Sequence, residues 1–349
     1  MQPFSIAGHH VGPEHPVLVI AELSGNHHQS LATAKAMIKA AADAGVQAIK
    51  LQTYTPDTMT LDINRDEFLI RDADNLWQGK SLYQLYAEAM TPWEWHQPLF
   101  DYARSLGLLA FSTPFDASAV ALLESLEVPC YKIASFENTD HALLAAVAST
   151  GKPVLLSTGM ATVAELADSV AVLRRHGCEQ LLLLKCTSHY PADPVDANLL
   201  TLPHLQSLFN CPVGLSDHTL GIGVAVAAVA HGACVVEKHF VLDRAAGGID
   251  SEFSLQPDEF ATLVTETERA RLALGGIRYG CSEREQASRK FRRSLYISAD
   301  LQQGQLLSAD NVRAVRPGLG LPVKYLPQLL GRPVQRDVCA GTPLQWELI

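Results

Sequence analysis

The chain has 349 residues, of which 48% are hydrophobic and only 18% charged, so it can bury a large core and is not a disordered chain. Its formal net charge is -10, and no cluster of Lys and Arg would follow a phosphate backbone, which excludes nucleic acid as an expected partner. The seven cysteines are scattered without a CxxC pair, as reduced thiols would be. With no signal-peptide pattern and no stretch long enough to span a membrane, we expect a cytoplasmic protein.

A short run rich in Val, Ile and Leu recurs eight times in the first two thirds of the chain, at residues 17–22, 46–53, 108–114, 129–135, 153–159, 181–188, 212–217 and 233–240. Amphipathic stretches with helical spacing separate these runs, among them 30–44, 92–106, 116–127, 139–150 and 161–176. Apolar strands that alternate with helices predict a parallel sheet covered by helices, and eight such units predict a (β/α)₈ TIM barrel. An open doubly wound sheet is the alternative, but no Gly-x-Gly-x-x-Gly follows the first run.

Two segments depart from this rhythm. Residues 54–90 predict a long insertion with one helix near 80–90, which we expect to act as a lid. The barrel domain is expected over 1–280 and is followed by a polar linker at 281–291. Residues 292–349 have short strands and turns rich in Gly and Pro, which predict a small second domain. So small a domain has little core of its own, so we expect it to dock on another surface.

Each predicted strand ends in side chains that can bind or react. They are Glu22, Lys50, Gln52, Ser112, Thr113, Lys132, Ser135, Ser157, Thr158, Thr187, Ser188, Tyr190, Ser216, His218, Glu237 and His239. In barrel enzymes the catalytic groups gather at the carboxyl ends of the strands, so we expect these residues around one mouth.

His218 and His239 follow the seventh and eighth predicted strands, which are neighbours about 4.8 Å apart in a barrel. Two imidazoles at that spacing could share a divalent cation and leave coordination positions open, as a catalytic metal requires. Glu22 and Asp250 could add carboxylate oxygens or act as bases. The alternative is that these are hydrogen-bonded structural histidines, since the chain has 13 His, but their adjacent placement favours a site.

Lys50 and Lys132 end the second and fourth predicted strands, beside a set of hydroxyl side chains. Cations and hydroxyls that converge on one point favour a phosphate or carboxylate ligand. Two alternatives remain open: a Schiff base on one lysine, as in an aldolase, and lysines that merely extend from the rim into solvent.

Eight motifs in collinear order resemble the sialic acid synthase family. They are IAELSGNHHQS at 20–30, AIKLQTYTPDTMTLD at 48–62, FSTPFD at 111–116, YKIASFE at 131–137, LLSTGMAT at 155–162, LKCTSHYP at 184–191, GLSDHT at 214–219 and EKHFVLDR at 237–244. The last 60 residues resemble the antifreeze-like (SAF) domain of that family. Within it, QTYTPDTMTLD and GKSLYQLYAEAMTPWEW are most similar to the branch that makes pseudaminic acid. The chain departs from the family at His28-Gln29 and at Ser188, where sialic acid synthases carry Asn.

The resemblance implies condensation of phosphoenolpyruvate with an open-chain sugar, 2,4-diacetamido-2,4,6-trideoxy-β-L-altrose, with release of phosphate. It implies that His218 and His239 hold Mn²⁺ or Mg²⁺, that Glu22 is the base for water and that Asp250 helps to position the sugar. Phosphoenolpyruvate would be bound by Lys50, Thr113, Lys132, Ser135, Ser157 and Ser216, and the sugar by Gln52, Glu137, Tyr190 and Arg316.

The family also implies a domain-swapped homodimer, in which Arg316 comes from the partner's small domain. Three alternatives stay open: synthesis of N-acetylneuraminic or legionaminic acid, a Schiff-base aldolase, and a carbohydrate-binding protein without activity.

Overall fold

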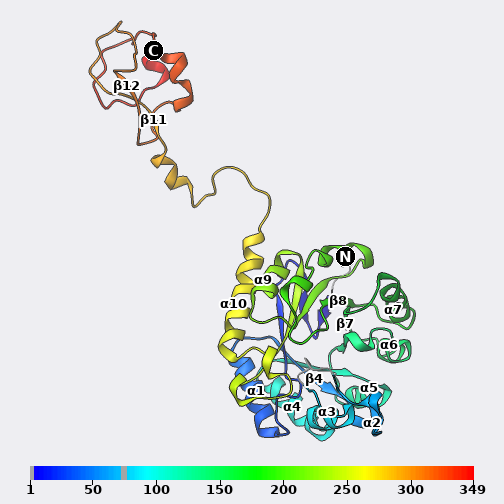
Figure 1. The fold of residues 1–349 in the computed structure, drawn as a ribbon. Helices are drawn as coiled ribbons and strands as arrows, with labels where there is room; N and C mark the ends of the chain where they lie inside the picture. Colours follow the sequence, from blue (N-terminus) through cyan, green and yellow to red (C-terminus); the bar gives the residue numbers. More distant parts are fainter. Residues whose placement is uncertain (1–3, 72–76) are drawn as a thin grey trace. The chain divides into compact units, whose positions relative to one another are not determined.

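A computed structural model describes residues 4–71 and 77–349 and divides the chain into two units, Met1–Gly275 and Gly276–Ile349. The first unit is a closed barrel of eight parallel strands surrounded by helices (Figure 1). The strands are β3 (Leu18–Glu22), β4 (Ala48–Thr53), β5 (Leu109–Pro114), β6 (Tyr131–Ile133), β7 (Val154–Ser157), β8 (Leu181–Cys186), β9 (Val213–Asp217) and β10 (Ala233–His239). β10 pairs with both β9 and β3 and so closes the barrel. Every apolar run in the sequence contains one of these strands, and the predicted TIM barrel is confirmed.

The helices pack their apolar faces on the outside of the barrel. They are α1 (Leu31–Asp43), α4 (Trp93–Ser105), α5 (Ala117–Ser125), α6 (His141–Ala148), α7 (Val163–Arg175), α8 (Thr201–Phe209), α9 (Gly223–Ala230) and α10 (Pro257–Leu274). Several begin at a side chain that caps the first turn: Asp116 accepts hydrogen bonds from the backbone of Ser118 and Ala119, and Thr162 forms a capping box with Glu165. These caps fix where each loop ends and each helix begins, and so help to set the positions of the residues at the strand ends.

The register of the strands brings distant residues to one level. Glu22 pairs with Lys50 on one side and with His239 on the other. Along β10, side chains alternate between the two faces of the sheet: Glu237 and His239 line the barrel cavity, whereas Lys238 between them is ion-paired with Asp217 of β9. Of these three consecutive ionisable residues, Glu237 and His239 thus face the cavity, and Lys238 faces the other side of the sheet.

The insertion between β4 and β5 contains α2 (Pro56–Met59), a 3₁₀ helix at Asp66–Phe68 and α3 (Leu82–Ala89). α3 is the helix predicted near 80–90. The Tyr83 hydroxyl joins α3 to α2 through Asp57, and the indole of Trp77 donates to the carbonyl of Ile249, 2.9 Å away, in the segment after β10. Residues 72–76 of the predicted lid lie outside the described residues.

Short elements complete the first unit. A hairpin of β1 (Phe4–Ile6) and β2 (His9–Val11) precedes the barrel, and its three-residue strands were too short to be predicted from periodicity. Further 3₁₀ helices lie at Ser135–Glu137, Pro194–Asp196, Arg244–Ala246 and Ser251–Phe253.

The second unit has its own small core around β11 (Ser294–Ile297) and β12 (Val312–Val315), which pair antiparallel. It also contains α11 (Leu326–Leu329) and 3₁₀ helices at Val323–Tyr325 and Trp346–Leu348. A 3₁₀ helix at Gln286–Phe291 lies in the predicted linker. Across the described residues, the structure holds no helix that is both long and apolar enough to cross a membrane.

Candidate active site

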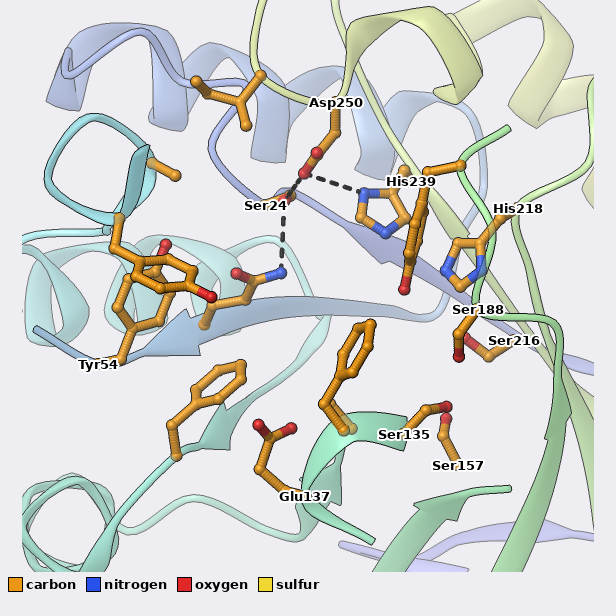
Figure 2. A pocket seen from close by; sticks show the side chains of 18 of the residues that line it. Ser24, Tyr54, Ser135, Glu137, Ser157, Ser188, Ser216, His218, His239 and Asp250 are labelled. Atoms are coloured by element: carbon orange, nitrogen blue, oxygen red, sulfur yellow. Dashed lines mark hydrogen bonds and ion pairs between the residues drawn. The ribbon is translucent and has the colours of Figure 1, made fainter. Parts of the chain in front are cut away.

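A cavity of about 610 Å³ opens at the carboxyl ends of the barrel strands (Figure 2). Most of the predicted site residues line it: Lys50, Gln52, Lys132, Ser135, Glu137, Ser157, Tyr190, Ser216, His218, His239 and Asp250. Glu22 and Thr113 are buried beside the cavity without lining it. Ser112 turns away, to Thr53, so it does not supply the cavity hydroxyl that its position suggested. Arg316 belongs to the second unit, and its approach to the sugar stays a prediction.

Lys50, Lys132 and Glu237 form the floor of the cavity, and Glu22 is buried next to them. Lys50 Nζ lies 2.5 Å from Glu22 Oε2 and 3.8 Å from Glu237 Oε1, and it donates a hydrogen bond to Thr113 Oγ1. Lys132 Nζ lies 3.3 Å from the same oxygen of Glu237, which also accepts a hydrogen bond from Ser216. The Glu237 carboxylate therefore stands between both cations.

The charges of this floor depend on one another. Burial opposes ionisation of Glu237, but Lys132 and Lys50 outweigh it and hold the pKa of that carboxyl at about 2. Burial likewise opposes the charge of Lys50, yet Glu22 and Glu237 raise its pKa above the ordinary value. For Lys132 burial dominates and the pKa falls, although Glu237 counteracts it. The carboxylates therefore favour the charged form of Lys50, whereas at Lys132 they only partly offset the effect of burial.

Glu237 was predicted at the mouth as a strand-end residue, and the structure places it there, but no specific role had been assigned to it. The signal was present in the alternation of β10, because any strand that directs His239 into the barrel must direct Glu237 there as well.

An arc of hydroxyl groups lines one side of the cavity. Ser135, Ser157, Ser188 and Ser216 all line it, as Figure 2 shows, and the hydroxyl of Ser157 is buried without a hydrogen-bond partner. Gly159 makes room for this arc, since any side chain there would collide with the hydroxyls of Ser135 and Ser188. Its backbone N–H donates to Ser135 Oγ at 3.1 Å. Hydroxyl and cationic donors that converge in this way suit a phosphate or carboxylate group.

The two histidines stand side by side, with ring centroids 5.3 Å apart. His218 Nδ1 lies 2.9 Å from the carbonyl oxygen of Thr187, which requires the proton on Nδ1, so in the neutral ring the lone pair is on Nε2. His239 Nδ1 faces Asp250 Oδ2 at 3.5 Å and has no closer partner. Histidines that bind metals are oriented in this manner, by an acceptor at the other ring nitrogen.

These residues therefore fit a divalent cation. Within residues 4–71 and 77–349, no group of three or more His, Cys, Asp or Glu is arranged to hold a metal. A cation here would accordingly take two imidazoles from the protein and its other ligands from substrate or water.

The two candidate carboxylate bases differ in position. Asp250 lines the cavity, and its Oδ2 contacts the hydroxyl of Ser24. Burial opposes its ionisation, but His239 and Ser24 bring the pKa of Asp250 below the ordinary value. Glu22 is fully buried, and its oxygens contact Lys50 and the backbone N–H of Ser24.

The remaining side of the cavity is apolar. Tyr54, at the end of β4, packs edge-on against Tyr86 of α3 and Phe115 after β5, and Leu82 and Leu85 of α3 complete the surface. We call these five residues the apolar wall. Sequence reasoning missed it because its residue types are those of any core, and only the turn of α3 toward the mouth exposes them to a ligand.

Comparisons with known proteins agree with the fold and the site described above. The NeuB family model matches residues 37–279 and the SAF domain model matches residues 292–349, and the chain belongs to the NeuB family.

The chain is 43% identical over 329 residues to the pseudaminic acid synthase of Campylobacter jejuni, covering 94% of this chain and 95% of that protein. It is 35% identical over 337 residues to the N,N'-diacetyllegionaminic acid synthase of Legionella pneumophila, covering 95% and 94%. Among solved structures, the N-acetylneuraminic acid synthetase of Leptospira borgpetersenii in complex with citrate superposes with a TM-score of 0.72 at 35% identity, covering 82% of this chain and 95% of that one.

Proposed function

We propose that the chain is a pseudaminic acid synthase, which condenses phosphoenolpyruvate with 2,4-diacetamido-2,4,6-trideoxy-β-L-altrose and releases phosphate. The observation that carries the reaction class is a single cavity in which a two-lysine anion site adjoins a pair of histidines. The choice of sugar is supported by the higher identity to a pseudaminic acid synthase, 43%, than to a legionaminic acid synthase, 35%.

Phosphoenolpyruvate is held at the anion site, where Lys132 and the hydroxyl arc bind its phosphate and carboxylate. Its C3 attacks the aldehyde carbon of the sugar and forms the new C–C bond, and the aldehyde oxygen takes up a proton. The positive charge left at C2 is quenched by a water molecule, which gives its proton to a carboxylate. The resulting intermediate loses phosphate by C–O cleavage, its C2 hydroxyl proton leaves with the phosphate, and the 2-keto acid remains.

His218 and His239 would hold Mn²⁺ or Mg²⁺, which when bound polarises the aldehyde oxygen as a Lewis acid. Thr187 and Asp250 orient the two imidazoles from behind. The proton of the water goes to Glu22 or to Asp250. Glu22 contacts Lys50, which links Glu22 to the phosphate site.

We further propose that the protein is a homodimer whose small domain covers the partner's barrel mouth, with Arg316 reaching the sugar. Support comes from the match of residues 292–349 to a SAF domain and from the family to which the chain belongs. Light scattering should give twice the mass of one chain. A monomer with full activity would contradict the proposal.

The decisive experiment measures phosphate release from phosphoenolpyruvate with Mn²⁺, comparing the diacetamido-trideoxy-altrose with N-acetylmannosamine. Release with the altrose, lost in Lys132→Met, is the expected result. Release only with N-acetylmannosamine would keep the reaction and overturn the substrate. Borohydride trapping of a substrate on Lys50 or Lys132 would replace the condensation by aldolase chemistry.

A further inference from the structure

Ser24, two residues after β3, lines the cavity although its backbone has a conformation that favours glycine. Its φ is 48°, in the left-handed region that residues with a side chain adopt at a cost, and it is 3% exposed. Strain of this kind persists where the surrounding structure holds the residue in place, and it is concentrated at functional sites. A glycine would adopt this turn more easily, so the side chain of Ser24 requires another explanation.

The hydroxyl of Ser24 joins two side chains of the cavity, as Figure 2 shows for Asp250. It accepts a hydrogen bond from Gln52 Nε2 at 3.3 Å and contacts Asp250 Oδ2. A carboxylate can only accept, so the hydroxyl donates its proton to Asp250 while its lone pair receives the amide of Gln52. One hydroxyl therefore connects the amide and the carboxylate in a fixed order.

This order decides which atoms Gln52 and Asp250 present to a ligand. Because Nε2 of Gln52 points to Ser24, its Oε1 is the end left for a ligand. Asp250 Oδ2 contacts Ser24 and faces His239 Nδ1 at 3.5 Å, which leaves Oδ1. Both of these oxygens are acceptors, so they suit hydroxyl donors.

The loop that carries Asp250 is held in place independently of Ser24. Asn26 accepts a hydrogen bond from the backbone N–H of Asp250 at 3.1 Å. Its amide also donates to the carbonyl oxygen of Phe240 at 3.0 Å and to Ser254 Oγ at 2.9 Å. Removing the hydroxyl of Ser24 should therefore free the side chains that it contacts without moving the loop.

We propose that Ser24 is a positioning residue for the sugar, which orients Gln52 and Asp250 so that their remaining oxygens accept hydrogen bonds from two hydroxyl groups of the substrate. The inference rests on the proposed function. Loss of the Ser24 hydroxyl leaves two acceptors free to rotate, which corresponds to about a tenfold higher sugar KM. The KM for phosphoenolpyruvate, which is bound at the two lysines, should not change.

Two substitutions at this position separate the hydroxyl from the backbone conformation. Ser24→Ala and Ser24→Gly both remove the hydroxyl, but only glycine relieves the left-handed strain, so Ser24→Gly should unfold at a higher urea concentration than Ser24→Ala. Both variants should nevertheless show the increase in sugar KM. A purely structural role for Ser24 predicts instead that the more stable glycine variant has the kinetics of wild type, and that result would overturn the proposal.

Glu127→Gly is the matched control. Glu127 also has a left-handed backbone, with a φ of 53°, but its side chain is exposed in the turn between α5 and β6. This turn precedes the strand, so it lies at the end of the barrel opposite the cavity. Glycine there relieves the same kind of strain and should leave the KM values of both substrates unchanged.

A double-mutant cycle tests whether Ser24 acts through Asp250. If it does, Ser24→Ala should change kcat/KM for the sugar much less in an Asp250→Asn background than in wild type. Losses that simply add would overturn the proposal, because they would show that Ser24 acts independently of the carboxylate.

Crystal structures of wild type and Ser24→Gly test the positioning role without any turnover. Failure of every sugar to release phosphate would refute the proposed function, and the two structures would then decide the role of Ser24. Movement of the Asp250 carboxylate away from His239, or of the Gln52 side chain, would support it. Side chains that keep their wild-type positions would overturn it.

Discussion

The buried ion pair between Lys238 and Asp217 is expected to be essential for the stability of the barrel. Lys238 is 0% exposed and donates to Asp217 Oδ2 at 2.8 Å and to the carbonyl oxygen of Thr219 at 2.7 Å. Asp217 Oδ1 accepts two further hydrogen bonds from Thr219. Lys238→Met removes the cation but leaves the carboxylate in a site closed to water.

The magnitude follows from that uncompensated charge. Removing one partner of a buried pair costs about 3–5 kcal/mol, and the two hydrogen bonds from Thr219 place this variant toward the lower end. Asp217→Asn should cost a similar amount, since it leaves the ammonium of Lys238 facing an amide. The double variant should be less destabilised than the sum of the two, because neither charge then remains.

Urea unfolding followed by tryptophan fluorescence measures this cost, with Trp346→Phe as the common background so that the signal comes from the first unit. Lys39→Met is the matched control, because Lys39 forms an exposed i,i+4 pair with Asp43 and should contribute less than about 0.5 kcal/mol. A loss below about 1 kcal/mol for Lys238→Met would refute the reasoning, since a buried carboxylate left without its cation should cost more than that.

Three further predictions concern the reaction. Treatment with a chelator should abolish phosphate release, and Mn²⁺ should restore it; full activity without metal would exclude the role proposed for His218 and His239. If Glu22 is the base for water, Glu22→Gln should lower kcat by about a hundredfold or more while Asp250→Asn mainly raises the sugar KM, and the reverse pattern would assign the base to Asp250. Because burial raises the pKa of Glu137 to about 7, its neutral form is lost as the pH rises through that value, so the sugar KM should increase above it. Glu137→Gln should give a flat profile, and an identical profile in both proteins would contradict this origin.

The barrel could be predicted from the sequence because parallel strands covered on both faces are almost wholly apolar. The run at 181–188 contains β8 (Leu181–Cys186), and the stretch at 92–106 contains α4 (Trp93–Ser105). The level of the strand ends then placed Lys50, His218 and His239 around one mouth without any knowledge of side-chain positions.

The sequence could not predict how deep each side chain lies in the barrel or which way each helix face points. Glu22 was expected at the cavity, but its place beneath Lys50 depends on how far each side chain extends at the end of its strand. The apolar wall depends on which side of α3 faces the mouth, which is a matter of tertiary packing. Glu137 was predicted only through the family resemblance, because a single glutamate after a strand does not indicate that its carboxyl will be buried and unpaired.

The alternation along β10 also limits how this stretch of the chain can change. Substitutions can alter the cavity side through Glu237 and His239, or the outer side through Lys238, one at a time. Inserting or deleting one residue within Ala233–His239 would exchange the two sides at once, placing an unpaired lysine in the cavity and a carboxylate against the helices. Among related chains, β10 should therefore vary in residue type but not in length.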